Sequence, residues 1–421
     1  MHTVLSAPPE PHSYMDTRTR AMNYFTAGVD AADPERGVEA ALAGAKFSNP
    51  TLIAIGKAAR AMTQAALRHM SPETVIVVTN YENAMPLAGA EVIAAAHPIP
   101  DAEGACAALR VEEALSMAQG DVVILISGGG SALLPAPVMG VSLEDKAKVN
   151  AVLLASGADI GTMNLVRQQL SRLKGGGLLR AAAPSFVTTL ALSDVVDNDL
   201  RVIASGPSIA PIGTREDAVT ALKHLNIWEK MPRSVQEHLT APEPDLGPLP
   251  DSEITLVGSN QHSVDAMVAL AQAEAPVHVY PSPLVGDVGE AAQKIIDFSQ
   301  SAGEGKGVYL FGGETTVALT GDGLGGRNQE LCLQVVKRAK AQGITNFTFL
   351  SGGTDGRDGP TDAAGGIVDD ATTARLVAAG LDLDDVLARN DSYHALEATG
   401  DLLKIGATGT NVADLQVFIR E

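Results

Sequence analysis

Short, continuous apolar runs recur along this chain and alternate with stretches of helical periodicity. Uninterrupted apolar runs are typical of strands buried on both faces of a parallel sheet, and the helices between them would cover those faces. The alternation therefore predicts an α/β fold. The predicted strands are 51–55, 74–78, 122–126, 186–192, 254–257, 277–280, 308–311, 347–350 and 415–419, and the predicted helices include 102–118, 216–225, 262–273, 290–301 and 328–341.

One segment, residues 240–252, indicates how the chain divides into domains. Its sequence, TAPEPDLGPLPDS, is rich in proline, acidic and without periodicity, as expected of a linker. At about 150 residues per domain, a chain of 421 residues is expected to hold two domains, with three as the alternative. We therefore predict one domain over 12–245 and a second over 250–421, with a final strand that can pair with either.

Composition excludes several classes of partner. A net charge of −20 disfavours nucleic acid and anionic membrane surfaces. Neither Cys106 nor Cys332 belongs to a CxxC or Cys/His cluster, so a disulfide framework and a zinc site are not expected. The N-terminus lacks the basic and apolar regions of a signal peptide, and apolar runs such as 122–126 are far shorter than the ~20 residues that span a bilayer. We expect a cytoplasmic protein.

Two of the predicted strands are followed by glycine-containing loops, at the sheet edge where open α/β folds bind ligands. Gly56-Lys57-Ala58 comes after the first strand, and a lysine beside the free N–H groups of a helix start suits a phosphate. Ser127-Gly128-Gly129-Gly130-Ser131 follows the strand 122–126. Three glycines let the backbone approach an oxyanion and present N–H groups to it. Lys57 could instead be a solvated lysine on the first turn of a helix, and the glycine loop could be a tight turn, but three glycines exceed what a turn needs.

A second basic and glycine-rich segment, Arg172-Leu173-Lys174-Gly175-Gly176-Gly177, indicates another anion contact. A helix C-cap is the alternative, although a cap needs one glycine only. Three acids, Asp194, Glu314 and Asp355, follow further predicted strands. Mg²⁺ is held by one or two carboxylates together with phosphate oxygens, so these acids suffice for a metal site. Each acid alone could be a helix cap or a turn residue.

Gly321, Gly323 and Gly326 spell G-x-G-x-x-G, the fingerprint of dinucleotide binding. The fingerprint should follow the first strand of a βαβ unit and precede an acid by about 20 residues, and neither condition holds here. We interpret the segment as a mobile loop that delivers Arg327, whose guanidinium suits a transferring phosphoryl group. A Walker A loop is absent from the sequence.

Taken in order, these motifs resemble the glycerate 2-kinase family of the MOFRL type, whose members have often carried the name hydroxypyruvate reductase. The resemblance extends from about Gly56 to Asp414. This sequence departs from the motifs of the family only in small changes, such as Ala96 before the His-Pro motif, where the family usually has glycine. Besides the segments above it rests on His97-Pro98-Ile99-Pro100-Asp101, Ser193-Asp194-Val195, Ser205-Gly206-Pro207, Gly312-Gly313-Glu314-Thr315-Thr316, Gly325-Gly326-Arg327-Asn328-Gln329-Glu330, Gly352-Gly353-Thr354-Asp355-Gly356 and Thr408-Gly409-Thr410-Asn411-Val412 with Asp414.

The resemblance implies a Rossmann-like N-terminal domain, a smaller C-terminal MOFRL domain and an active site between them. It also implies transfer of the γ-phosphoryl group of ATP, with a divalent cation, to the 2-hydroxyl of D-glycerate. By motif match it carries over the functional residues Lys57, Asp194, Glu314, Arg327, Asp355 and Asn411.

The mechanism that we expect assigns Lys57 and Arg327 to the transferring phosphoryl group and Asp194 to the 2-hydroxyl as its base. Glu314 and Asp355 would hold Mg²⁺. The loop 128–131 would bind phosphates or the carboxylate of glycerate, helped by Lys174 and Gly175. His97 would contact the substrate or lie in an exposed turn.

Two other functions stay open at this point: a nicotinamide-dependent hydroxypyruvate reductase, and a sensor that binds a phosphorylated metabolite without turnover. The sequence alone does not decide between a 2- and a 3-phosphate product, the pathway served, or which of the three acids is base and which binds metal. A homodimer is the oligomeric state that we carry forward as an expectation.

Overall fold

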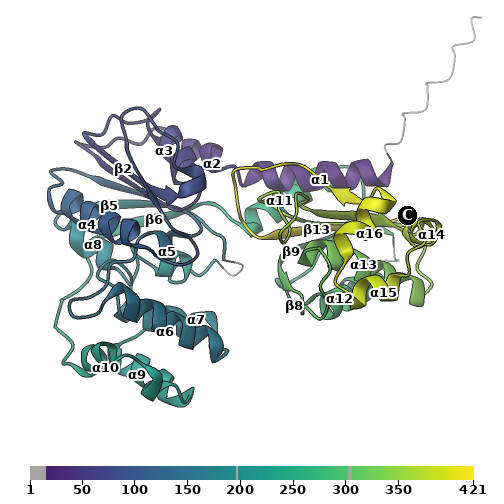
Figure 1. Cartoon of the computed structure of the whole chain (residues 1–421). Helices are drawn as coiled ribbons and strands as arrows, with labels where there is room; N and C mark the ends of the chain where they lie inside the picture. The colour runs from purple at the N-terminus through teal and green to yellow at the C-terminus, as the bar shows by residue number, and fades with distance from the viewer. Residues whose placement is uncertain (1–15, 196–197, 302–305) are drawn as a thin grey trace, which may run out of the picture. The chain divides into compact units, whose positions relative to one another are not determined.

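The computed structural model describes residues 16–195, 198–301 and 306–421. The N-terminal segment that we predict to lack a signal peptide falls outside these ranges. The described chain forms two compact units (Figure 1). The N-terminal unit consists of Val29–Ser263 and Ala407–Ala413, and the C-terminal unit of residues up to Gly28, Val264–Gly406 and Asp414–Glu421. Among the described residues, none of the helices combines the length and the apolar character that a transmembrane span requires.

The N-terminal unit is built on a six-stranded parallel sheet in the order β3-β2-β1-β4-β5-β6. This is the strand order of doubly wound nucleotide-binding folds, so the predicted Rossmann-like architecture is confirmed. The strands are β1 (Thr51–Ile55), β2 (Thr74–Asn80), β3 (Glu91–Ala95), β4 (Val122–Ile126), β5 (Val187–Leu192) and β6 (Ser252–Gly258).

Alternate residues of the central strands supply two separate cores, one on each face of this sheet. On β1, Ile53 and Ile55 pack in the core formed with α4 and α8, whereas Leu52 and Ala54 pack in the core formed with α2 and α3. Both faces are apolar because both are covered, as the continuous apolar run predicts. The four helices are α2 (Pro34–Leu42), α3 (Ala59–Ala66), α4 (Ala102–Ser116) and α8 (Gly177–Ala182).

A group of helices with its own apolar core adjoins the sheet in the same unit (Figure 1). Val149 and Leu153 on α6 pack there with Leu222 on α9 and Val235 on α10. The short helix α5 (Gly130–Leu133) follows β4 directly. The helices of the group are α6 (Leu143–Ala155), α7 (Ile160–Gln169), α9 (Arg215–His224) and α10 (Arg233–Thr240).

The C-terminal unit is built on a mixed sheet in the order β12-β11-β10-β13-β9-β7, with β8 paired to β9. The final strand, β13, lies antiparallel between β9 and β10, so it belongs to this unit. The elements are α1 (Thr17–Ala31), α11 (Asn260–Ala271), β7 (Val277–Val279), β8 (Leu284–Asp287), α12 (Val288–Ser301), β9 (Gly307–Thr316), α13 (Arg327–Ala341), β10 (Phe347–Gly353), β11 (Gly365–Asp369), α14 (Thr372–Ala378), α15 (Leu383–Ala388), α16 (Ser392–Thr399), β12 (Leu402–Leu403) and β13 (Asp414–Arg420).

The division into units differs from the predicted ranges 12–245 and 250–421. Strand β6 extends the N-terminal sheet beside β5, and the residues up to Gly28 belong to the C-terminal unit. The proline-rich segment is a surface loop inside the N-terminal unit. The guanidinium of Arg180 on α8 donates hydrogen bonds to the carbonyl oxygens of Leu246, Gly247 and Pro248, which fixes this loop against the helix.

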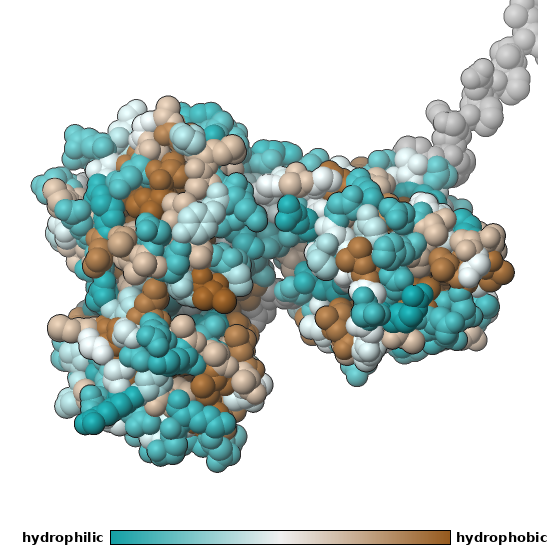
Figure 2. Space-filling model, in the orientation of Figure 1, coloured by the Kyte–Doolittle hydropathy of each residue, from teal (hydrophilic) through white to brown (hydrophobic). Residues whose placement is uncertain are grey.

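Apolar surface on the face shown in Figure 2 occurs as small separate patches among polar residues. Scattered apolar residues of this kind are normal on a protein surface.

The close contact of α2 with β6 generates a first prediction. A Cβ atom at Gly37, in α2, would lie 2.2 Å from the carbonyl oxygen of Val257. Gly37→Ala should therefore lower the free energy of unfolding by about 1–3 kcal/mol through overpacking, although alanine favours helix. Urea unfolding would measure this. Arg36→Ala, at the exposed neighbouring position, should change the value by less than about 0.5 kcal/mol. Equal effects would contradict the packing.

Candidate functional site

The loops that follow β1 and β4 pack backbone against backbone at the point where the strand order of the parallel sheet reverses. The Lys57 N–H donates to the carbonyl oxygen of Gly128 at 2.9 Å, and the Ala58 N–H donates to the Ser127 hydroxyl at 3.0 Å. Gly56 has a φ of +126°, and a Cβ there would lie 2.2 Å from Ser127 Oγ. Glycine is therefore required at this position, and ligands bind at such a reversal in open α/β sheets.

Lys57 and His97 both lie beside Gly129, in the middle of the loop after β4. A Cβ at Gly129 would lie 3.1 Å from His97 Cδ2 and 3.4 Å from Lys57 Cγ. The ring keeps much of its surface, but desolvation by its surroundings, with the charge of Lys57 as a second cause, lowers the pKa of His97. The lowered pKa favours the neutral imidazole near pH 7, which can donate one hydrogen bond and accept another.

Asp194, two residues after the end of β5, reaches the same loop from another strand. A Cβ at Gly128 would lie 2.5 Å from Asp194 Oδ2. Burial raises the pKa of Asp194, and the charge of Lys57 opposes that rise. A carboxylate with a raised pKa is suited to accept a proton near neutral pH. The structure thus brings together the predicted residues Lys57, His97, Gly128, Gly129 and Asp194.

Lys174 supports this loop from inside the protein. Its side chain is buried, with 7% of the residue exposed, and Nζ donates to the carbonyl oxygen of Ser131 at 2.8 Å. The Ser131 and Ser205 hydroxyls lie 2.9 Å apart, and the Gly175 N–H donates to the Ser205 carbonyl oxygen. Lys174, Gly175 and Ser131 therefore form one hydrogen-bonded layer with Ser205.

Gly130, the third glycine of the loop, lies tightly against the same layer. A Cβ there would lie 3.0 Å from Ala204 Cβ.

Asn411 lies in the short segment of the chain that returns to the N-terminal unit. Its Oδ1 accepts a hydrogen bond from the Ala413 N–H at 3.3 Å, and the Asn260 amide fixes the same segment through the carbonyl oxygen of Val412.

In the C-terminal unit, the register of three strands gathers acidic residues at one edge of the sheet. Asp414, the first residue of β13, pairs with Gly313 on β9 and with Gly353 on β10. Glu314 and Asp355 follow these two glycines closely. The strands β9 and β10 are separated by two strand spacings, roughly 10 Å, so the three carboxylates belong to the same edge.

Arg327, the first residue of α13, is bound by two of these carboxylates. Nε and Nη2 donate to the two oxygens of Asp414 at 2.7 and 2.9 Å, and Nη1 lies 2.9 Å from Glu314 Oε1. Burial raises the pKa of Asp414, while Arg327 lowers it. Despite its burial, these partners hold the pKa of Arg327 above its usual value. Asp414 is fully buried, so Arg327 also has a structural role.

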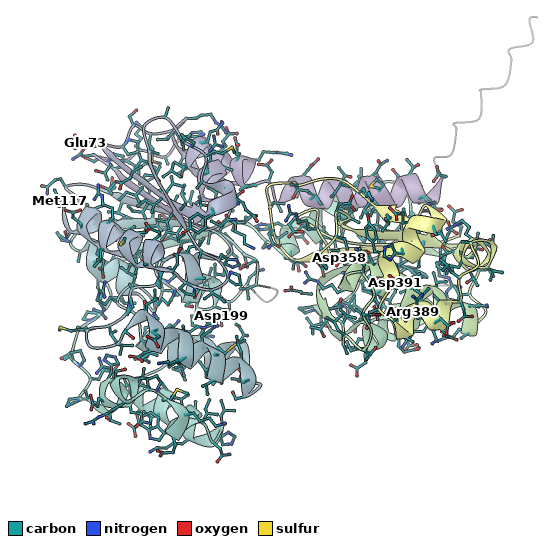
Figure 3. All side chains as sticks on the ribbon, viewed as in Figure 1. Glu73, Met117, Asp199, Asp358, Arg389 and Asp391 are labelled. Atoms are coloured by element: carbon teal, nitrogen blue, oxygen red, sulfur yellow. The ribbon has the colours of Figure 1, made fainter. Side chains whose placement is uncertain are left out.

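The segment 321–326 is anchored to the C-terminal unit, and this contradicts its interpretation as a mobile loop. The Thr320 and Gly321 N–H groups donate to Asn390 Oδ1 at 2.7 and 2.9 Å, and the Leu324 N–H donates to Asp391 Oδ1 at 3.1 Å. A Cβ at Gly321 would lie 2.4 Å from the carbonyl oxygen of Arg389. The glycines permit close packing against 389–391, two residues of which are labelled in Figure 3.

Asp358, also labelled in Figure 3, holds the start of α13 and was not predicted from the sequence. Its carboxylate accepts the Asn328 and Gln329 N–H groups at 3.1 and 2.9 Å. Burial raises the pKa of Asp358 to about 6, and these two hydrogen bonds oppose the rise. Asp358 thereby positions Arg327. Asp414 was likewise not predicted to be a site residue, because the sequence does not show which residue an acid at the start of an apolar strand will contact.

The described residues do not contain a ready-made metal cluster. No group of three or more His, Cys, Asp or Glu side chains in this part of the chain is arranged to hold a cation. Glu314 Oε1 is engaged with Arg327, and Asp355 Oδ1 accepts the Arg357 N–H at 2.9 Å.

The proximity of Lys57 to His97 can be tested by titration. Lys57→Met removes a positive charge and should raise the pKa of His97 towards its ordinary value, without reaching it because the desolvation persists. Histidine NMR titration would measure this. Lys46→Met, at an exposed position on the same unit, should leave the pKa unchanged. An unchanged His97 pKa in Lys57→Met would contradict this geometry.

Comparison with known proteins identifies the family. A model described as a domain of unknown function (DUF4147) matches residues 20–240, and the MOFRL family model matches 307–414. A D-glycerate 2-kinase from Thermotoga maritima is 38% identical over 407 residues, which cover 94% of this chain and 96% of the relative. A relative from Agrobacterium vitis that is named as a hydroxypyruvate reductase is 37% identical over 412 residues, with 94% and 92% covered.

The crystal structure of a glycerate kinase from Thermotoga maritima matches this fold with a TM-score of 0.88 and 37% sequence identity. The match covers 96% of this chain and 99% of that one. Sequence and structure therefore agree over nearly the whole length of the chain, which belongs to the glycerate 2-kinase family of the MOFRL type.

Proposed function

We propose that this chain is a glycerate 2-kinase that transfers the γ-phosphoryl group of ATP to the 2-hydroxyl of D-glycerate. The observation that carries the proposal is the convergence of Lys57, His97 and Asp194 on the glycine loop after β4, in a chain of this family. Phosphoryl transfer requires positioning and neutralisation of charge more than covalent chemistry. A lysine, an acid with a raised pKa and a loop of backbone N–H groups supply these functions.

In the proposed mechanism Asp194 accepts the proton of the 2-hydroxyl as that oxygen attacks the γ-phosphorus of ATP, the bond to the β,γ-bridging oxygen breaks and ADP leaves. Its raised pKa brings it closer to the pH at which a general base is most effective. Lys57 neutralises charge on the transferring phosphoryl group, and the N–H groups of Gly128 and Gly129 bind oxyanions of the reactants. The Gly130 N–H donates to the Ser127 carbonyl oxygen and so holds the loop in shape.

We assign a second cation to the phosphoryl group, the guanidinium of Arg327. Its fork with Asp414 uses Nε and Nη2, so the remaining amino group, Nη1, is shared between Glu314 and a ligand. Asn411 is assigned a polar contact with a reactant. Because Asp414 is buried, removing Arg327 should also destabilise the C-terminal unit.

Glu314 and Asp355 fit Mg²⁺ that arrives with the nucleotide. Mg²⁺ needs only one or two protein carboxylates when phosphate oxygens and water complete its octahedron. Glu314 is exposed and Asp355 half-buried, and both lie at the sheet edge marked by Asp414. When bound, the ion would neutralise charge on the phosphate oxygens.

The proposal is tested by incubating the protein with D-glycerate, ATP and Mg²⁺ and adding enolase directly. Enolase should consume the product without a mutase, because it acts on 2-phosphoglycerate. A product that requires a mutase would assign the 3-hydroxyl instead. Absence of a phosphorylated product, in a sample that binds ATP, would contradict the proposal.

The relative named as a hydroxypyruvate reductase supplies the control reaction. Its name favours oxidation of NADH by hydroxypyruvate, whereas the glycine loop after β1 lacks the G-x-G-x-x-G fingerprint. We expect no NADH oxidation above background. Oxidation at a rate that exceeds phosphorylation would replace the kinase with the reductase.

Two glycines with nearly equal positive φ angles make it possible to distinguish an effect on catalytic geometry from an effect of backbone strain. Gly129 has a φ of +86° beside His97 and Lys57, and Gly140 has a φ of +85° with nothing within 4 Å of a Cβ. Alanine at either position should cost about 1–3 kcal/mol of stability. Only Gly129→Ala should also lower kcat, by about 10- to 100-fold, because it displaces the side chains that position reactants. Equal kcat values in the two folded variants would remove this loop from the mechanism.

A further inference from the structure

Lys146, on α6, has an unusual environment that the proposed mechanism does not use. Its Nζ atom is buried and has no hydrogen-bond partner, although the residue as a whole is half-exposed. Lysines ordinarily bury the aliphatic stem and keep the ammonium group in water. Lys148, two residues further along the helix, follows the ordinary rule and pairs with Glu144 at 2.9 Å. Lys146 therefore turns its charge inward, where burial is unfavourable without a partner.

Two further cations belong to the same interior region. Arg167, on α7, donates from Nε and Nη2 to Oδ1 of Asn150, and Asn150 lies one helical turn beyond Lys146 on α6, on the same face. Lys174 is the third member, and the charges of both Lys146 and Arg167 act on it. The basic cluster is thus formed by Lys146, Arg167 and Lys174.

The basic cluster has no carboxylate partner among the described residues. The hydrogen-bond acceptors of Arg167 and Lys174 are the neutral Asn150 amide and the Ser131 carbonyl oxygen, and Lys146 Nζ has none. Arg172, close by, shows the ordinary arrangement, because Nη2 lies 2.7 Å from Glu112 Oε2. Three basic side chains without a carboxylate partner are unexpected in a chain of net charge −20, and a bound anion would supply that partner.

The basic cluster is connected directly to the glycine loop. Lys174 donates to the carbonyl oxygen of Ser131, the residue after Gly130. On α7, Asn164 lies three residues before Arg167, on the same helical face, and its Oδ1 accepts the Ser205 hydroxyl at 2.7 Å. The Ser205 hydroxyl also lies 2.9 Å from that of Ser131. An anion held by the cluster would therefore lie next to the loop.

We propose that Lys146, Arg167 and Lys174 form a binding site for a small oxyanion adjoining the loop 128–131. Its identity rests on the proposed function: the oxyanion is either the carboxylate of the hydroxy-acid or a phosphoryl group of the nucleotide. The planar carboxylate and the tetrahedral phosphoryl group both present oxygens that accept several charge-assisted hydrogen bonds.

The protonation behaviour of the basic cluster agrees with this assignment. Burial, followed by the charges of Arg172 and Arg167, lowers the pKa of Lys146 to about 8. Burial, followed by the charges of Lys146 and Arg167, holds the pKa of Lys174 well below its ordinary range. A bound anion would favour the charged form of both amines, so that binding and protonation support each other.

The site is tested by isothermal titration calorimetry with three probes: inorganic phosphate, D-glycerate and ADP. Lys146→Met should weaken phosphate binding by about 10- to 100-fold, the effect of losing one charged hydrogen-bond donor. The variant should fold, because methionine replaces an unpartnered buried charge with an apolar chain of similar length. Lys148→Met is the matched control on the same helix and should bind all three probes as the wild type does.

The two reactants identify the source of the oxyanion. Loss of D-glycerate affinity with ADP binding intact assigns the carboxylate, and the reverse assigns a phosphoryl group. Unchanged affinity of Lys146→Met for all three probes, or an equal loss in Lys148→Met, would overturn the site. Because binding is measured without turnover, a protein that binds phosphate through Lys146 but makes no phosphoglycerate would disprove the proposed function and leave this inference standing.

Discussion

The candidate site depends first on the close approach of two backbones at the reversal of the parallel sheet. Gly56, after β1, leaves no space for a side chain against Ser127, and the Lys57 N–H is bonded to Gly128. This contact fixes the loop 128–131 relative to β1. Lys57, His97 and Asp194 come from three different strand ends, so their mutual geometry follows from where this loop lies. A scaffold of this kind positions reactive groups on rigid elements, which limits the freedom that the reaction must remove.

The C-terminal unit uses charge for the same purpose. Asp414 is fixed by strand register between Gly313 and Gly353, and it is fully buried. Its fork with Arg327 compensates a carboxylate that would otherwise be costly, while Asp358 binds the backbone at the start of α13. The result is an arginine whose position is over-determined. The same contacts make Arg327 part of the fold, so its substitution affects stability as well as chemistry.

The strand ends that carry chemistry could be predicted because the apolar runs and their polar terminations are local features. The strands 51–55 and 122–126 coincide with β1 and β4, and Lys57, Gly129 and Asp194 converge as their positions at strand ends suggest. Contacts between residues distant in sequence could not be predicted. The sequence shows that Asp414 and Asp358 are acidic, but their contacts with α13 arise only from tertiary packing. We placed the domain boundary at the proline-rich segment, which the structure shows to be a surface loop of the N-terminal unit. Proline occurs in surface loops as readily as in linkers. Burial of the Lys146 ammonium group is equally invisible in a helical pattern.

The central claim is that phosphorylation of D-glycerate takes place at the loops after β1, β4 and β5. It is tested most directly by a double-mutant cycle of kcat with Lys57→Met and Asp194→Asn, each variant being checked for its folded state. Each single substitution should lower kcat by at least about 100-fold. The double variant should lose much less than the product of the two effects, because residues that act on one transition state are not additive. Near-normal turnover in either folded single variant would contradict the account.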